Sequence, residues 1–366
     1  MTKLMRKKPS GNNIEDALQE ARQRAQELAR DTQERIRDTQ ERVREAQERA
    51  VELARARALE AQELARRARE TMPPGLPVRL LSSIIGIPLL LAFVFWEGPS
   101  AAFPALPFTG AVALCAVVGS LEYFRGLRLR GFQPNEALAT IAIVLLQFAA
   151  WNVSRNRVNA FLPALIAILV IGTLIYEVAS HEKEPLANIG VTFFGVVYVG
   201  WLFSYLIFLR SLPGPLDLSL FGHPLPQSTF GAWVVLYVFA VTWSTDAGAY
   251  FVGSALGKTK LAPRLSPKKT VEGAIGGILA ATAMSLLWGI WIGLPWQHCA
   301  ILGPLIGVLG QIGDLCESAL KRDIGVKDFG MVLPGHGGIL DRFDSLLFTA
   351  PIAYYYLQFF VVHSLK

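Results

Sequence analysis

Residues 159–177 read NAFLPALIAILVIGTLIYE, and no charged side chain occurs between Phe161 and Tyr176. A helix needs about 20 mostly apolar residues to cross the hydrocarbon core of a bilayer. Other stretches of the chain have a similar length and composition. The nine candidate spans are residues 79–97, 101–124, 136–152, 159–177, 188–209, 229–252, 273–294, 298–315 and 343–363. The sequence therefore predicts an all-α, polytopic membrane protein with about nine transmembrane helices.

The overall composition agrees with this class. The chain is 52% hydrophobic and 17% charged, whereas an average soluble domain is nearer a quarter charged. The net charge of +6 does not indicate a nucleic-acid partner, because outside the N-terminal region the basic residues lie in loops between apolar runs. Residues 1–20 lack a basic segment followed by an apolar one, so no cleavable signal peptide is expected. The three cysteines, which have no metal-ligand spacing, predict neither a disulfide nor a zinc site.

The N-terminal region has a different character. Residues 31–51 repeat every seven as DTQERIR, DTQERVR and EAQERAV, which predicts a long charged helix with acid-to-base pairs four residues apart. Its 3–4 seam is mostly small or polar, so a solvated helix and a weak coiled coil both stay open. Pro73 and Pro74 then end the helix. The predicted domains are a helical extension at 1–71, a linker at 72–78 and a membrane domain at 79–366.

The orientation follows from the Lys and Arg residues of the connecting loops. With the N-terminus in the cytoplasm, the internal loops hold Arg125, Arg128, Arg130, Lys183, Lys258, Lys260, Arg264, Lys268, Lys269, Lys321, Arg322, Lys327 and Arg342. The external loops and the C-terminal tail hold Arg155, Arg157, Arg210 and Lys366. This asymmetry follows the positive-inside rule. It predicts that the two most polar stretches face the cytoplasm, where nucleotides are found.

The first polar stretch is Thr245–Gly277. Asp246 lies within an otherwise apolar run, where an acid is costly and marks a functional candidate. Small residues, backbone amides and paired lysines suit a polyphosphate, which needs several donors at close range. The candidate phosphate-binding residues here are Ser266, Lys268, Lys269, Glu272 and Gly273. Ordinary loop charge for the lysines and close helix packing for the glycines remain alternatives.

The second polar stretch is Gly313–Asp344. Asp314 and Glu317 are three residues apart, as are Asp341 and Asp344, so each pair would share a face of a helix. Paired carboxylates at a membrane border are tolerable with a divalent cation between them, and hard oxygen ligands beside phosphates suit Mg²⁺. A network of salt bridges between loops is the structural alternative. His336, with glycine on both sides, is a candidate acid or base.

Residues 318–344, SALKRDIGVKDFGMVLPGHGGILDRFD, resemble the signature of the CDP-diacylglycerol synthases, also called phosphatidate cytidylyltransferases. The elements of that signature are Ser318, Lys321, Arg322, Lys327, Asp328, Pro334, His336, Gly337, Gly338, Asp341, Arg342 and Asp344. The run Ser266-Pro-Lys-Lys-Thr-Val-Glu-Gly and the run from Asp246 to Tyr250 are also similar to family motifs. The resemblance covers residues 79–366 and leaves out the charged segment 1–71.

The resemblance implies that CTP and phosphatidic acid react to give CDP-diacylglycerol and pyrophosphate. It implies a Mg²⁺-dependent site that faces the cytoplasm of a bacterial or organellar inner membrane, and a homodimer. Carried over by position, Asp314 and Asp341 are the first metal ligands expected, with Asp246 and Asp344 as secondary ones. Lys321, Arg322 and Arg342 are expected to hold the phosphatidate head group or the leaving pyrophosphate. Lys327, Gly337 and Gly338 are expected at the substrates.

Two other functions fit parts of the pattern. A polyprenol kinase or an ether-lipid cytidylyltransferase would use similar phosphate chemistry on another lipid. A transporter would carry polar groups in matched positions of two repeats, whereas the acids here cluster in the C-terminal third. Glu122 and Glu177 lie at the ends of predicted helices and are interpreted as border residues.

Overall fold

The computed structural model describes only part of the chain. The described residues are 30, 76–97, 105–156, 161–180, 184–214, 219–220, 223–224, 227–330, 332 and 337–362. Apart from Arg30, the predicted charged helix and its coiled-coil alternative lie outside them. Residues 76–78, which were predicted as linker, are instead the first residues of helix α2.

Helices form nearly all of the described structure. Their bounds are α2 Leu76–Phe95, α3 Leu106–Leu129, α4 Glu136–Asn156, α5 Phe161–Ser180, α6 Pro185–Gly195, α7 Leu202–Arg210, α8 Gln227–Leu256, α9 Val271–Trp291, α10 Trp296–Ile324 and α11 Leu340–Leu357. Two π-helical segments are η1 Val196–Trp201 and η2 Gln358–Val362. α6, η1 and α7 are continuous and form one span, Pro185–Arg210.

The prediction of a polytopic helical membrane protein is confirmed. Among the described residues, 8 helices are long and apolar enough to cross a bilayer. They coincide with the second to ninth predicted spans. α2, at the first predicted span, has 20 residues, of which Ser83–Phe95 form a shorter apolar helix.

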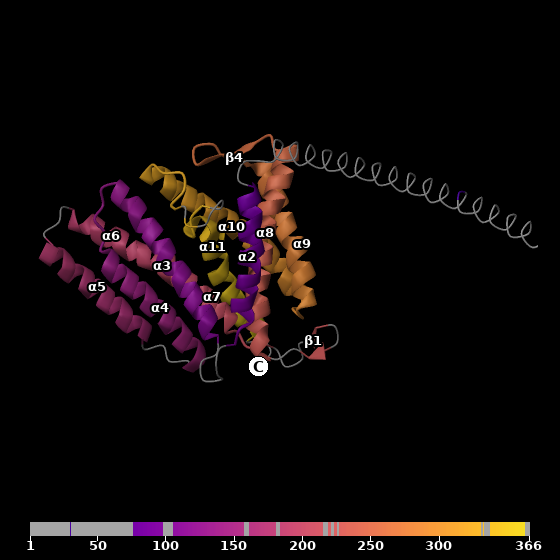
Figure 1. Cartoon of the computed structure of the whole chain (residues 1–366), viewed down its shortest axis with the longest axis horizontal. Helices are drawn as coiled ribbons and strands as arrows, with labels where there is room; N and C mark the ends of the chain where they lie inside the picture. The colour runs from indigo at the N-terminus through magenta and orange to yellow at the C-terminus, as the bar shows by residue number, and fades with distance from the viewer. Residues whose placement is uncertain are drawn as a thin grey trace, which may run out of the picture. The chain divides into compact units, whose positions relative to one another are not determined.

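The helices lie side by side in one bundle (Figure 1). α3, α4, α5 and α6 occupy one side and α8 and α9 the other, with α7, α10 and α11 between them. α7 contacts α4 and α8 from the two sides as well as α11, and its residues from Phe203 to Arg210 are all buried. The core of the bundle is therefore built around α7, whereas α5 is its most exposed candidate span.

Glycines set the close contact between α8 and α9. A Cβ atom at Gly248 would lie 2.4 Å from Ala280 Cβ, and one at Gly276 would lie 2.4 Å from Val252 Cβ. Small residues let helix backbones approach in a membrane, where packing replaces the hydrophobic driving force. The packing interpretation of these glycines therefore agrees with the structure.

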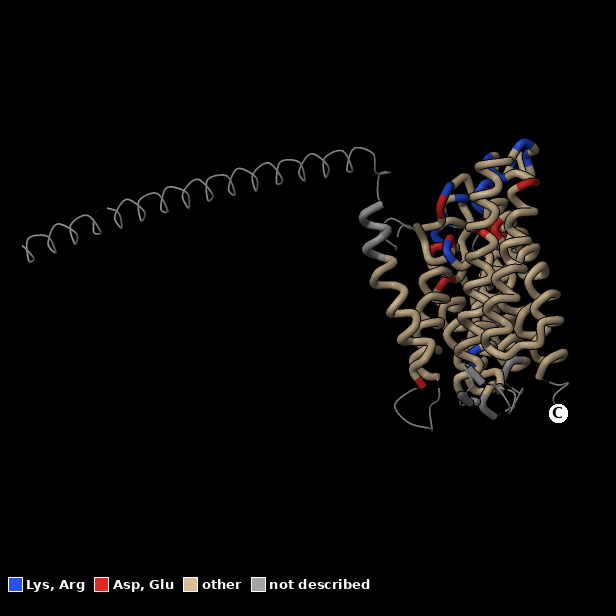
Figure 2. The backbone as a smooth tube through the Cα atoms, turned by 90° about the vertical axis from the view of Figure 1, so that its right-hand side faces the viewer, with Lys and Arg blue, Asp and Glu red and all other residues tan. Residues whose placement is uncertain are grey.

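Two short antiparallel hairpins interrupt the helical pattern. β1 (Ser219–Leu220) pairs with β2 (His223–Pro224), and β3 (Lys260–Ala262) pairs with β4 (Ser266–Thr270). β4 and β1 lie at opposite ends of the bundle (Figure 1). Figure 2 shows that the charged residues of the described chain gather toward one end, the end of β4. The bundle therefore has one strongly charged end, as the loop charges predict.

Candidate active site

Helix α10 carries the first group of site residues on one face. It continues to Ile324, although its span was predicted to end at 315, so the first part of the second polar stretch is helix and not loop. Asp314, Glu317 and Lys321 follow one another at spacings of three and four residues, which places them on one face of the helix. The prediction that Asp314 and Glu317 share a helix face is confirmed.

A buried ion-pair network joins α10 to α11. Lys321 Nζ lies 3.0 Å from Glu317 Oε2 and 2.9 Å from Asp341 Oδ1. The exposed fractions of the side chains of Glu317, Asp341 and Lys321 are 0%, 4% and 12%. Since each buried charge needs its partner, Lys321 joins α10 to α11 through Asp341, while Glu317 pairs with Lys321 within α10.

Asp341 lies in the first turn of α11 and is surrounded by donors. Besides Lys321, its carboxylate accepts hydrogen bonds from the backbone N–H groups of Gly338 (3.0 Å) and Phe329 (3.2 Å). The polar connection runs from the end of α10 at Ile324 to the start of α11 at Leu340. These contacts hold it against the first turn of α11. They indicate a positioning role for Asp341, and its role as a metal ligand stays a prediction.

Glu122 of α3 is a site residue that the sequence interpretation missed. Its exposed fraction is 5%, and its Oε1 and Oε2 atoms accept hydrogen bonds from the backbone N–H groups of Ile339 (3.1 Å) and Leu340 (3.0 Å). The interpretation as a border residue therefore missed its contacts with the start of α11. The signal that could have found it is the one applied to Asp246, an acid within an apolar run.

A second, more accessible group of charges lies beside this network. Asp314 forms an ion pair with Lys269 of β4, and the two side chains are about equally half-buried, at 29% and 26% exposed. Asp246 of α8 is exposed and interacts electrostatically with Asp344, Asp314 and Lys269. The structure thus brings together residues from both polar stretches, as their charges suggested.

Asp344 of α11 connects the two groups. It interacts electrostatically with Asp314 and lies beside Glu317. The carboxylates of Asp246, Asp314, Glu317 and Asp344 therefore come from three helices and converge on one region. No group of three or more metal-ligating side chains meets the geometry of a metal site within the described part of the chain.

The donor set is nevertheless compatible with Mg²⁺. This ion is usually held by one or two carboxylates, with water and substrate phosphates completing its shell. Asp314 accepts from Lys269 and Asp341 from Lys321, but the side chain of Asp314 is 29% exposed and that of Asp341 only 4%. Asp246 is exposed as well. The accessible carboxylates of Asp314 and Asp246 are therefore better placed than Asp341 to hold the ion.

The hairpin residues divide into structural and exposed ones. Thr270 Oγ1 accepts a hydrogen bond from Gly273 N (3.2 Å), so Thr270 caps α9. The carboxylate of Glu272 accepts from the backbone N–H groups of Lys258 (3.1 Å) and Thr259 (3.2 Å). Glu272 and Gly273 therefore have structural contacts within the protein, and their roles in substrate binding stay predictions.

The remaining predicted residues lie near the charged end. Ser266 and Lys268 are in β4, where Lys268 is exposed. Arg322, Lys327 and Arg342 are exposed, and Arg322 Nη1 donates to the carbonyl oxygen of Val326 (3.1 Å). His336 lies outside the described residues.

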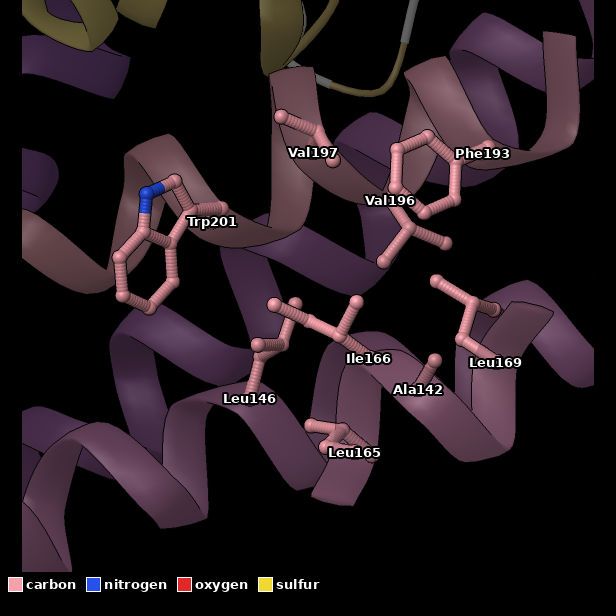
Figure 3. A pocket seen from close by; sticks show the side chains of 9 residues that line it. All are labelled: Ala142, Leu146, Leu165, Ile166, Leu169, Phe193, Val196, Val197 and Trp201. Carbon is pink, nitrogen blue, oxygen red and sulfur yellow. The ribbon is translucent and has the colours of Figure 1, made fainter. Parts of the chain in front are cut away.

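The phosphate chemistry does not belong to the apolar cavity in Figure 3. This cavity has a volume of about 260 Å³ and is lined by α4, α5, α6 and η1. Its lining residues are Ala142, Leu146, Leu165, Ile166, Leu169, Phe193, Val196, Val197 and Trp201. None of them is ionisable, so the cavity suits hydrocarbon and the polar cluster is the candidate active site.

Comparison with known proteins identifies the family. A model of the cytidylyltransferase family matches residues 77–360, which include every site residue described above. The chain belongs to this family. A phosphatidate cytidylyltransferase of Synechocystis sp. is 37% identical over 295 residues, which cover 76% of this chain and 95% of that protein. One of Bacillus subtilis is 36% identical over 267 residues, covering 70% and 90%. One of Brucella suis is 40% identical over 231 residues, covering 59% and 82%.

Membership of the family agrees with the resemblance of the signature at 318–344. In this cytidylyltransferase, the signature supplies the face of α10, the start of α11 and the connection between them. The matched region begins after the charged N-terminal segment.

Proposed function

We propose that this chain transfers the cytidylyl group of CTP to phosphatidic acid and releases CDP-diacylglycerol and pyrophosphate. The observation that carries the proposal is the convergence of acids and lysines from α8, β4, α10 and α11 at one end of an apolar bundle. Such a site can meet a soluble nucleotide while the acyl chains of the lipid stay in the bilayer. The relatives named phosphatidate cytidylyltransferase support the choice of substrates.

The chemical problem is an attack of one anion on another. A phosphate oxygen of phosphatidate forms a bond to the α-phosphorus of CTP, and the bond from that phosphorus to the β-phosphate bridging oxygen breaks. The nucleophile is already ionised, so positioning and charge neutralisation are the main requirements. Lys269, held by Asp314, and the exposed Lys268 would neutralise the nucleotide phosphates. Arg322 and Arg342 would hold the lipid head group or the leaving pyrophosphate.

Mg²⁺ is the cofactor proposed for this site. Asp314, with Asp246 or Asp344, would hold it. When bound, the ion would neutralise charge on the phosphate oxygens. The buried network of Lys321, Glu317 and Asp341 would keep the start of α11 in place beside it.

The proposed location is the cytoplasmic face of a bacterial or organellar inner membrane, with the chain as a homodimer. The cytoplasmic side is supported by the excess of Lys and Arg in the loops at the charged end, since positive loops remain inside. A cysteine-labelling experiment on whole cells tests it. A cysteine introduced at exposed Arg264 should react with a membrane-permeable maleimide and not with an impermeant one.

The activity is tested by the position of the label on CTP. Purified protein is incubated with phosphatidate, Mg²⁺ and CTP labelled on either the α- or the γ-phosphorus, and the lipids are extracted. Cytidylyl transfer predicts that only the α label enters the lipid. A lipid kinase would transfer the γ label, which would refute the proposal. Ether-linked and polyprenyl substrates are compared in the same assay, and preference for either would correct the substrate.

A further inference from the structure

We propose that Glu122 is a positioning residue of the active site, which holds the start of α11 through two backbone amides and thereby keeps Asp341 and Lys321 in place. Its effect on catalysis rests on the proposed function. Its effect on the polar connection between α10 and α11 does not.

The first argument is the state of the helix terminus. The first N–H groups of an α-helix have no partner within the helix and need acceptors from elsewhere. Ile339, the residue at the N-cap position of α11, makes no side-chain capping bond. Glu122 supplies both acceptors from α3, with one carboxylate oxygen for Ile339 N and the other for Leu340 N. A negative charge at this end also interacts favourably with the helix dipole.

The second argument is the shape of the polar connection around the carboxylate. A Cβ atom at Gly330 would lie 2.1 Å from Glu122 Oε1, and one at Gly338 would lie 2.6 Å from Glu122 Oε2. Both contacts are closer than real Cβ atoms approach, so a larger residue at either position would displace the Glu122 carboxylate from its two amides. The chain therefore lies against Glu122 at Gly330 and again at Gly338, the last residue of the Gly-His-Gly-Gly run of the signature.

The third argument links Glu122 to the ion-pair network. Gly338 lies against Glu122 and also donates its N–H to Asp341 Oδ2. Asp341 in turn accepts from Lys321. A shift of the start of α11 would therefore move Asp341 relative to Lys321. Glu122 has no contact of its own with the accessible acids among the hydrogen bonds of the described residues, so it acts through other residues.

A carboxylate is the group that this geometry selects. Both partners are N–H donors, so two acceptor oxygens are needed. Glutamine has the same size but one acceptor, and its NH₂ group would face a second donor. Aspartate keeps the charge but is one methylene shorter. These two variants separate the acceptor count from the reach.

The experiment compares Glu122→Gln and Glu122→Asp with a matched control, Glu177→Gln. Glu177 is also a buried glutamate, but it lies on α5, at the edge of the bundle away from α11 (Figure 1). Hydrogen exchange is measured by mass spectrometry on purified protein, in peptides that contain Ile339 and Leu340. Steady-state rates are measured with CTP and phosphatidate.

We expect faster exchange at Ile339 and Leu340 in Glu122→Gln than in wild type, with no change there in Glu177→Gln. We also expect kcat to fall roughly 10- to 100-fold, as is usual when a partner outside the reacting shell is removed, while KM for CTP changes less than about threefold. Wild-type exchange at these amides in both Glu122 variants would overturn the proposal. So would an equal loss in Glu177→Gln. Faster exchange without any cytidylyl transfer in the wild type would instead refute the proposed function alone.

Discussion

Replacement of Lys321 by methionine tests the buried ion-pair network most directly. Methionine keeps most of the side-chain volume and removes the charge. The substitution leaves the carboxylates of Glu317 and Asp341, which are 0% and 4% exposed, without their shared cation. Removing one partner from a buried ion pair costs roughly 3–5 kcal/mol. For a domain of this size, we expect the melting temperature to fall by about 6–20 °C.

The matched control is Arg130→Met, which breaks an exposed ion pair with Asp323. Its side chains are 47% and 70% exposed, and exposed pairs contribute at most about 1 kcal/mol. Both variants are purified in the same detergent at neutral pH and melted with tryptophan fluorescence as the signal. Lys321→Arg, which keeps the charge, should recover part of the loss. If Lys321→Met had the same melting temperature as Arg130→Met, the network would contribute no more to stability than a surface pair, and the reasoning would be wrong.

Further predictions concern the glycine, the accessible acids and the hairpin. Gly338→Ala should lower both melting temperature and activity, because its Cβ would collide with Glu122, whereas Gly86→Ala, whose Cβ would meet nothing within 4 Å, should do neither. Asp314→Asn and Asp246→Asn should each lower kcat by at least about 100-fold and shift the melting temperature by less than a few degrees. A variant with near-wild-type turnover, or activity that survives chelation of divalent ions, would contradict the metal role. Glu272→Gln should speed hydrogen exchange at Lys258 and Thr259, and unchanged exchange would show that its contacts are dispensable.

The sequence predicted the membrane bundle well because its signal is local. A run of about 20 apolar residues identifies a span without any knowledge of its neighbours. The same local reasoning placed Asp314 and Glu317 on one helix face, and the charged end of the bundle followed from loop composition. The pairing of Lys269 with Asp314 was not predicted, because the two lie in different polar stretches and spacing along the chain does not reveal it.

The predictions failed where contacts between distant residues outweigh the local sequence pattern. The span at α10 was predicted to end at 315 because the last turns of the helix are charged, but Lys321 pairs there with Glu317 and Asp341 inside the protein. A hydropathy average therefore assigns this charged end of α10 to a loop. Glu122 was set aside because it lies at the end of a predicted helix. Its partners are more than two hundred residues away in the chain, and spacing within one sequence does not reveal such a contact.

The contact between Glu122 and Leu340 also imposes an order in time. The two residues are 218 positions apart, and ribosomes add roughly 5–20 residues per second. α3 therefore exists for about 10–40 s before the amides that satisfy its glutamate have been synthesised. Throughout that interval the nascent chain carries an acidic side chain at the membrane without its final partners. Completion of the last helices is thus the step at which this acid gains its native environment, and a chain released earlier would still lack it.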